Sequence, residues 1–231
     1  MPAAVSDEPP ASALQSFFGD HTDLARAFAG HLAGTGVARG LLGPREVPRL
    51  WSRHILNCAA VAPLLPPGAH VVDVGSGAGL PGLVLAVARP DIRVTLVEPL
   101  LRRVTWLQEV TDDLGLASVS VLRARAEELQ GLGADIATAR AVAALDRLSA
   151  WCFPLLRGEG VLLAIKGRSA AEELAQAEPA LRALGAAGWR VLELGGDLLE
   201  EPTTVVEVRK GADSNRVRTS RAGSRRSRSR R

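Results

Sequence analysis

The chain is poor in the residues that build metal centres and disulfide frameworks. Cys58 and Cys152 are its two cysteines, and they stand far apart in the sequence. The histidines are scattered and show no metal-ligand spacing: His21, His31, His54 and His70. This usage argues against a disulfide scaffold or a zinc site, and it predicts a protein without a bound metal.

Long hydrophobic runs are missing as well. No apolar stretch approaches the roughly 18 residues that a membrane span requires. The opening MPAAVSDEPPASAL lacks the basic start and the apolar centre of a signal peptide. We therefore expect a soluble cytoplasmic protein with no membrane contact.

Size and composition predict one main domain. The 231 residues are 47% hydrophobic, which suffices for one substantial core but not for two full-sized domains. We see no internal repeat. We expect a helical cap over residues 1–67, an α/β domain over 68–210 and a separate tail over 211–231.

The basic character of the chain lies in this tail. Residues 211–231 contain eight arginines and one aspartate, a net charge of +7, whereas the whole chain carries +3 and the remainder therefore −4. A segment rich in Arg and Ser with almost no apolar residue is predicted to be disordered. Its arginines suit phosphate groups, which favours nucleic-acid binding, but a solubilising terminus is equally compatible with them.

The front of the chain has helical periodicity. Apolar residues recur at helical spacing over residues 13–33, and the Gly-rich stretch 34–44 breaks that pattern. A second helix is predicted from Pro44, with Pro48 near its start, and it stops at the Pro-Pro-Gly run 66–68.

From residue 69 onward, short β-rich runs alternate with helical stretches that begin near residues 81, 100, 145 and 170. Such alternation predicts a parallel sheet with helices on both faces. The last run, residues 203–210, follows without a helix and predicts one antiparallel strand. The fold class is thus a Rossmann-like α/β domain with seven strands, the first six expected at 70–75, 92–98, 119–124, 135–140, 160–167 and 189–195.

The stretch VVDVGSGAGLPG, residues 71–82, can be counted in two glycine frames. Counted from Gly77, with Gly79 and Gly82, it satisfies the dinucleotide fingerprint and suggests a nicotinamide or flavin oxidoreductase. That frame requires the strand to run straight into Gly77, but the four preceding residues include a glycine, a serine and an aspartate. The strand would end too early, so the frame fails.

Counted from Gly75, the strand HVVDV feeds the turn directly, and Asp73 lies on its last turn. The turn then reads Gly75-x-Gly77-x-Gly79, and Leu80 occupies the position where a dinucleotide fold needs its third glycine. An acidic residue before such a turn is typical of a loop that holds S-adenosylmethionine. A buried Asp73 would be costly if it were merely structural.

Three further residues point to an adenosine-containing ligand. Glu98 closes the second predicted strand, where a carboxylate can accept both ribose hydroxyls. Ala126 and Glu127 follow the third strand and could read the adenine edge. Taken alone, Glu98 could be a solvated strand-end residue and Glu127 a charge at a helix N-terminus.

Two cations end the fourth and fifth strands. Arg140 stands where enzymes that methylate exocyclic amino groups carry Asn or Asp followed by two prolines. It could hold a carboxylate, a phosphate or a base oxygen, or it could simply extend to water. Lys166, one of two lysines in the chain, ends the next strand and is either catalytic or structural.

Together these residues resemble the bacterial 16S ribosomal RNA guanine-N7 methyltransferase family, RsmG or glucose-inhibited division protein B. The resemblance covers roughly half of the chain, and it rests on RHIL (53–56), DVGSGAGLPGLVLA (73–86), EPLLRRVTWLQEV (98–110), RAEEL (125–129), ARA (139–141) and KG (166–167).

The resemblance implies methylation of one guanine in the 530 loop of 16S RNA, with S-adenosylmethionine as the methyl donor. It implies cofactor contacts at Gly75, Leu80, Ala126, Glu127 and Arg140. It also implies that Lys166 lies near the reacting centre. The front piece departs from the family's Asn-rich stretch, so substrate contacts there cannot be carried over.

The expected partner is 16S RNA or a small-subunit assembly intermediate, bound by a monomer. Guanine N7 loses no proton on methylation, so we expect no general base, and we expect Arg140 or Lys166 to contact O6 or phosphate and leave N7 free. The alternatives are a methyltransferase for another RNA or for protein, a non-catalytic assembly factor, and an NAD-dependent oxidoreductase.

Overall fold

The computed structural model describes residues 7–196 and 198–212. Its centre is a seven-stranded sheet in the order β3-β2-β1-β4-β5-β7-β6. β7 runs antiparallel to both of its neighbours, whereas the pairs formed by β1 to β5 are parallel. The strands are β1 His70–Val74, β2 Arg93–Val97, β3 Val119–Leu122, β4 Ala134–Arg140, β5 Leu156–Lys166, β6 Ala186–Leu194 and β7 Thr203–Lys210.

The predicted fold class is confirmed, including the antiparallel strand at residues 203–210. The helices that follow the strands also begin within a residue or two of their expected positions. They are α4 Gly82–Ala88, α5 Leu101–Asp113, α6 Leu145–Cys152 and α7 Ala170–Ala183.

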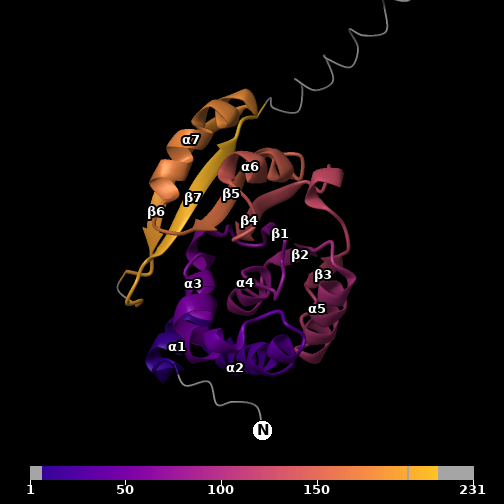
Figure 1. Cartoon of the computed structure of the whole chain (residues 1–231), viewed down its shortest axis with the longest axis vertical. Coiled ribbons are helices and arrows are strands. Elements are labelled where there is room, and N and C mark those ends of the chain that lie inside the picture. The colour runs from indigo at the N-terminus through magenta and orange to yellow at the C-terminus, as the bar shows by residue number, and fades with distance from the viewer. Residues whose placement is uncertain (1–6, 197, 213–231) are drawn as a thin grey trace, which may run out of the picture.

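Helices cover the two faces of the sheet in separate layers. The cap helices, α4 and α5 pack on one face, and α6 and α7 pack on the other (Figure 1). Alternation along β1 shows the division, because Val71 belongs to the core on the cap side while Val72 and Val74 belong to the core beneath α6 and α7.

The first cap segment differs from the single helix predicted over residues 13–33. It consists of α1 Ala11–Phe18 and α2 Thr22–His31, separated by a turn at Gly19, whose φ of +52° interrupts the helix. The predicted break after residue 33 is instead a π-helical turn, Leu32–Gly36. A Cβ on Gly36 would lie 3.3 Å from the His31 carbonyl oxygen, a tight contact that glycine avoids.

The second cap segment begins at Pro44 as predicted, but it is not one regular helix. A 3₁₀ turn, Pro44–Arg49, is followed by a π-helical segment, Leu50–Ile55, and then by α3 Leu56–Ala59 and a 3₁₀ turn, Ala62–Leu64. Pro48 lacks an N–H and so removes one helical hydrogen bond where the pattern changes.

Asp7 binds the start of the π-helical segment. Its carboxylate accepts hydrogen bonds from the backbone N–H groups of Trp51 and Ser52, at 3.2 and 3.0 Å. No helix among residues 7–196 and 198–212 is long and apolar enough to cross a membrane. The predicted domain boundaries stay predictions, and all of the basic tail after residue 212 lies outside the described residues.

Candidate active site

The glycine turn follows β1 at the carboxyl edge of the sheet. Gly75, Gly77 and Gly79 have φ angles of +69°, +54° and +78°, which favour glycine over residues with a side chain. The Gly75 N–H donates to the Val97 carbonyl of β2 at 2.8 Å. A Cβ on Gly75 would stand only 2.8 Å from the Val142 side chain, so close packing as well as the backbone angle favours glycine at this position.

Asp73 lies beneath this turn and is fully buried. Its Oδ2 accepts a hydrogen bond from the Gly82 N–H, the first of α4, at 3.1 Å. A Cβ on Gly82 would come within 2.7 Å of that same oxygen, so the small size of Gly82 permits the close approach of helix and strand. Asp73 therefore ties both ends of the turn together.

Burial also makes the charge on Asp73 costly. Desolvation raises the pKa of this carboxyl to about 7, although hydrogen bonds from Ser76 and Gly82 act in the opposite direction. Its Oδ1 has no hydrogen-bond partner in the described part of the chain. The Asp73 carboxyl is thus a buried polar group with one oxygen that no described residue satisfies.

Glu98 faces the glycine turn from the end of β2. Its side chain is 1% exposed, and its Oε2 accepts from the Gly77 N–H at 3.0 Å while Oε1 accepts from the Leu100 N–H at 3.0 Å. Arg103 of α5 approaches Oε2 at 3.5 Å. Each carboxylate oxygen keeps a further lone pair, so Glu98 is a fixed acceptor able to bind vicinal hydroxyls.

A cleft of about 940 Å³ opens where these strands end. It lies at the carboxyl edge on both sides of β1, which is where ligands bind in doubly wound sheets. The predicted site residues that line it are Gly75, Gly77, Leu80, Glu98, Ala126, Glu127 and Arg140. Asp73, Gly79 and Lys166 are absent from its lining.

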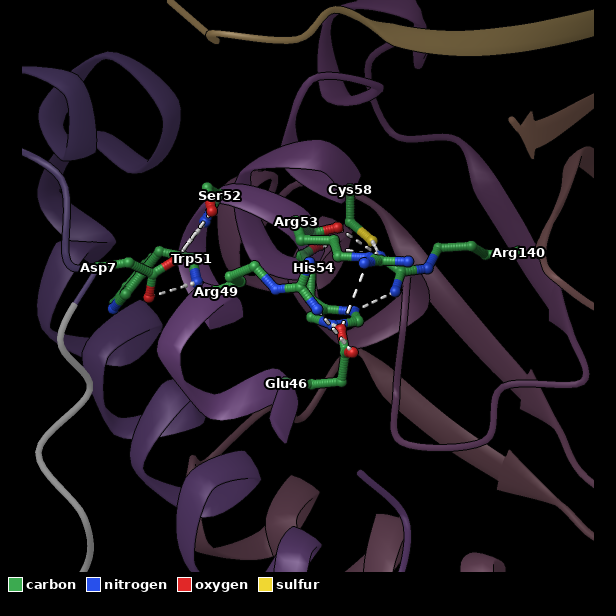
Figure 2. A network of polar contacts seen from close by, with 9 residues as sticks. All are labelled: Asp7, Glu46, Arg49, Trp51, Ser52, Arg53, His54, Cys58 and Arg140. Atoms are coloured by element: carbon green, nitrogen blue, oxygen red, sulfur yellow. Dashed lines mark hydrogen bonds and ion pairs between the residues drawn. The ribbon is translucent and has the colours of Figure 1, made fainter. Parts of the chain in front are cut away.

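Arg140 reaches from the end of β4 into the cap (Figure 2). Its Nη1 donates to the carbonyls of Arg53 and His54, both at 3.3 Å, and to the Cys58 sulfur at 3.5 Å. Its Nη2 makes a short hydrogen bond to Nδ1 of His54. Burial raises the pKa of the Cys58 thiol to about 11, so the thiol stays protonated beside the guanidinium.

These bonds use one edge of the guanidinium. Arginine has five N–H donors, and the cap engages those of Nη1 and one of Nη2. No partner for the Nε–H or for the second Nη2–H is found among residues 7–196 and 198–212. Arg140 lines the cleft, and its Nε/Nη2 edge keeps donors that could bind a ligand oxygen.

His54 is a cleft residue to which the sequence assigned no role. It lies within the RHIL motif, is 7% exposed, and its Nε2 contacts Glu46 Oε2 at 2.9 Å. Burial and the neighbouring Arg140 lower the pKa of His54, while Glu46 raises it in part. The RHIL motif in the sequence pointed to this region, but it could not show that His54 binds Arg140, which lies 86 residues away along the chain.

Lys166 lies elsewhere. Its Nζ donates to the Ala143 carbonyl at 2.8 Å and pairs with Glu173 of α7 at 2.7 Å, and its side chain is 11% exposed. Glu173 also accepts the Leu145 N–H at the start of α6. This position favours the structural alternative for Lys166, because the residue supports the loop after β4 and does not face the cleft.

Several residues of the cleft were not identified from the sequence. Arg103, Arg123 and Arg125 lie at its rim and add positive charge next to Glu98 and the 126–128 turn. The doublet RAR at 123–125 was visible as a basic flank of the third strand. Four apolar residues from three other parts of the chain also line it, with no local signal in the sequence: Leu41 and Leu42, Val142, and Trp151.

The fold and the cleft define a class I S-adenosylmethionine-dependent methyltransferase. The same architecture is found in a putative S-adenosyl-L-methionine-dependent methyltransferase of Methanococcus maripaludis, with a TM-score of 0.57 and 12% identity. The match covers 80% of this chain and 93% of that structure. At this identity the likeness concerns the fold alone.

Sequence comparison narrows the class to one family. Residues 21–198 match the family described as GidB, rRNA small subunit methyltransferase G, and the chain belongs to it. Ribosomal RNA small subunit methyltransferase G of Arthrobacter sp. is 58% identical over 85% of this chain and 91% of that protein. The protein of the same name from Mycobacterium marinum is 53% identical over 88% and 91%.

The expected family is thus confirmed, and with it an enzyme that uses S-adenosylmethionine to methylate small-subunit ribosomal RNA. The cleft suits that cofactor. It combines the glycine turn at Gly75 and Gly77, a buried acidic acceptor at Glu98 and, below the turn, the Asp73 Oδ1, which has no hydrogen-bond partner among the described residues. The glycine count from Gly75 is the one consistent with this family, and the oxidoreductase alternative is wrong.

Proposed function

We propose that this enzyme transfers the methyl group of S-adenosylmethionine to N7 of one guanine in the 530 loop of 16S ribosomal RNA. The observation that carries the choice of N7 is the state of His54. It is the single histidine of the described chain that lines the cleft, and both of its ring nitrogens are engaged, by Arg140 and Glu46.

An engaged imidazole is a poor general base, and N7 needs none. The N7 lone pair lies in the plane of guanine, and methylation removes no proton. Bound S-adenosylmethionine supplies an electrophilic methyl group on its sulfonium. The protein must then place N7 about 3 Å from that methyl group and counter the positive charge that the base acquires.

The cofactor-binding residues are proposed as follows. Gly75, Gly77 and Leu80 shape the turn against the methionine part, and Glu98 accepts the ribose hydroxyls. Ala126 and Glu127 lie at the adenine end of the cleft. Asp73 and Gly79 act from beneath, since neither lines the cleft and both fix the turn.

Arg140 is proposed as the residue that meets the base. Arginine ordinarily reads guanine through O6 and N7 together. Here N7 must accept the methyl group, so the Nε/Nη2 edge of Arg140 should contact O6 or a phosphate and leave N7 free. Lys166, which we had also expected near the base, is held by Ala143 and Glu173 and is proposed to act on the loop alone.

The RNA is proposed to approach over the exposed side chains of Arg123 and Arg125, with Arg103 beside them at the rim. Guanidinium groups suit phosphates, and a structured loop must release its base from the stack to reach the cleft. The substrate is 16S RNA or an assembly intermediate, the enzyme acts as a cytoplasmic monomer, and the 211–231 tail adds affinity.

Deleting the tail should make RNA binding less dependent on salt, because a protein that makes fewer phosphate contacts releases fewer counterions on binding. The site of methylation should stay the same. An unchanged salt slope would show that the tail does not contribute to RNA affinity.

The target assignment is tested by mass spectrometry of 16S RNA from a strain that lacks this protein. We expect N7-methylguanine to disappear from the 530 loop and to return when the chain is supplied again. If that nucleotide is unchanged and another RNA or a protein loses a methyl group, the alternative substrate is correct.

A further inference from the structure

We propose that His54 is a positioning residue for methyl transfer, because its Nδ1 holds the Arg140 guanidinium in the orientation that the reaction needs. The inference rests on the proposed function, in which Arg140 meets the base. His54 acts through Arg140 and need not touch the reacting atoms.

The contacts of Arg140 show why such a residue is needed. An arginine side chain has several rotatable bonds, and at the open end of β4 it would otherwise sample many orientations. The cap restrains it through the carbonyls of Arg53 and His54, and through the ring of His54. The carbonyls fix Nη1, whereas the His54 ring is the one acceptor found for Nη2 in the described part of the chain and so sets the rotation of the guanidinium plane.

The network also determines the tautomer of His54. Nδ1 accepts a hydrogen bond from Arg140, so it carries no proton, and the ring proton must sit on Nε2. Nε2 then donates to Glu46 Oε2 at 2.9 Å. Glu46 is itself held by Arg49 at 3.2 Å and by Arg53 at 3.6 Å, so the carboxylate stays in place (Figure 2).

Protonation of His54 would break this arrangement. With hydrogens on both nitrogens the ring can no longer accept from Arg140, and its charge repels the guanidinium. The charged groups that face His54 are Glu46, Arg53 and Arg140, and burial together with Arg140 keeps the pKa of His54 below its ordinary value. The correct neutral state therefore persists at neutral pH and is lost in acid.

The decisive comparison is His54→Leu against His54→Asn. The Asn side chain can place an oxygen near the position of Nδ1, so it preserves an acceptor for Arg140, whereas Leu preserves only bulk. With unmodified small ribosomal subunits as substrate, we expect kcat to fall about tenfold or more for His54→Leu and to recover largely for His54→Asn.

His70→Leu is the matched control. His70 is partly buried at the start of β1, where its Nε2 contacts Thr95 Oγ1 at 3.0 Å, and it is absent from the cleft. We expect this variant to keep the wild-type kcat. Equal losses in His54→Leu and His70→Leu, or a failure of Asn to restore kcat, would mean that His54 has only a structural role.

Glu46→Ala supplies a second test at a more exposed position. Since Glu46 raises the pKa of His54, removal of Glu46 should move the acid limb of the pH profile of kcat to lower pH. In His54→Asn, the part of that limb due to His54 should vanish. An acid limb that stays the same in both variants would overturn the proposal.

Nitrogen-15 NMR of the histidine rings gives a readout that does not require activity. In the free protein at neutral pH we expect His54, assigned by its loss in His54→Asn, to show a protonated Nε2 and an unprotonated Nδ1. The opposite tautomer would overturn the proposal. A wild-type enzyme that methylates no small-subunit RNA would instead refute the proposed function and leave the tautomer result standing.

Discussion

Arg140 and Lys166 end neighbouring parallel strands, yet they serve opposite faces of the sheet. Arg140 pairs in register with Ile165, the residue before Lys166. Side chains alternate along a strand, so Arg140 and Ile165 point toward the cap, while Lys166 points toward α6 and α7. A residue at the carboxyl edge of the sheet lies near the cleft, but its side chain enters the cleft only if it points to the cap face of the sheet.

Arg140 and Lys166 also differ in how many of their hydrogen-bond donors remain available to a ligand. Arg140 donates to the cap through Nη1 and Nη2, lines the cleft, and keeps donors on its Nε/Nη2 edge without a partner among the described residues. Lys166 is enclosed by Ala143 and Glu173, which satisfy its charge within the protein. This comparison is why we propose recognition of the base for Arg140 and support of the 141–144 loop for Lys166.

The largest expected effect is that of Arg140→Lys. Lysine keeps the charge but cannot bond the cap and a ligand at once through a planar fork, so kcat should fall about 10²-fold. Steady-state methyl transfer to small subunits measures this. Arg168→Lys, at a side chain that is 92% exposed, should change nothing. A wild-type kcat in Arg140→Lys would remove the distinction between the two strand ends.

Glu98→Gln should come next. The substitution replaces a buried carboxylate that accepts two backbone N–H groups, and charged hydrogen bonds of this kind contribute about 1.5–3 kcal/mol. Isothermal titration calorimetry should show an S-adenosylmethionine Kd raised roughly 10- to 100-fold. Glu127→Gln is the comparison, because its side chain is 41% exposed and should matter less. Equal effects would contradict the role given to Glu98.

Lys166→Met should act on stability more than on chemistry. Loss of the ammonium leaves the Ala143 carbonyl and Glu173 short of a donor, and urea unfolding should show about 1–3 kcal/mol less stability. The kcat at saturating substrate should stay close to that of the wild type. A variant of native stability with an Arg140-like loss of kcat would show that Lys166 reaches the substrate after all.

The smallest effect concerns the pH dependence contributed by Asp73. Its pKa is about 7 in the folded chain and 3.8 as the ordinary value, so the folded form holds the proton more tightly. The contribution of Asp73 to stability is then largest in acid and declines as pH rises from about 4 to 7. Urea unfolding at a series of pH values between about 4 and 7 should show the stability of Asp73→Asn rising relative to that of the wild type, whereas a constant difference would argue against a buried neutral carboxyl.

Much of the fold could be predicted because its signals are local. The β-rich runs, the helix starts and the glycine frame each depend on a few adjacent residues, and Gly82 could be placed after Pro81 at the start of a helix from the sequence alone. The cap was less predictable. Its π-helical segments pack in a core shared with distant parts of the chain, which no single stretch of sequence encodes.

The site divides in the same way. Gly75 and Glu98 follow their strands directly, and Ala126 lies in the turn after β3, so their approach to one edge could be foreseen. The hydrogen bond between His54 and Arg140 joins segments 86 residues apart. The face of the sheet to which Lys166 points follows from the register of β4 and β5, which the sequence does not show. Contacts that depend on long-range register require the structure.

The central claim is that the cleft presents guanine with N7 free and Arg140 at a neighbouring oxygen. A structure of the enzyme bound to the small ribosomal subunit and S-adenosylhomocysteine tests it directly. The account predicts the Arg140 guanidinium on O6 or a phosphate, N7 directed at the sulfur, and Lys166 still on Glu173. A side chain that donates a hydrogen bond to N7 would contradict it.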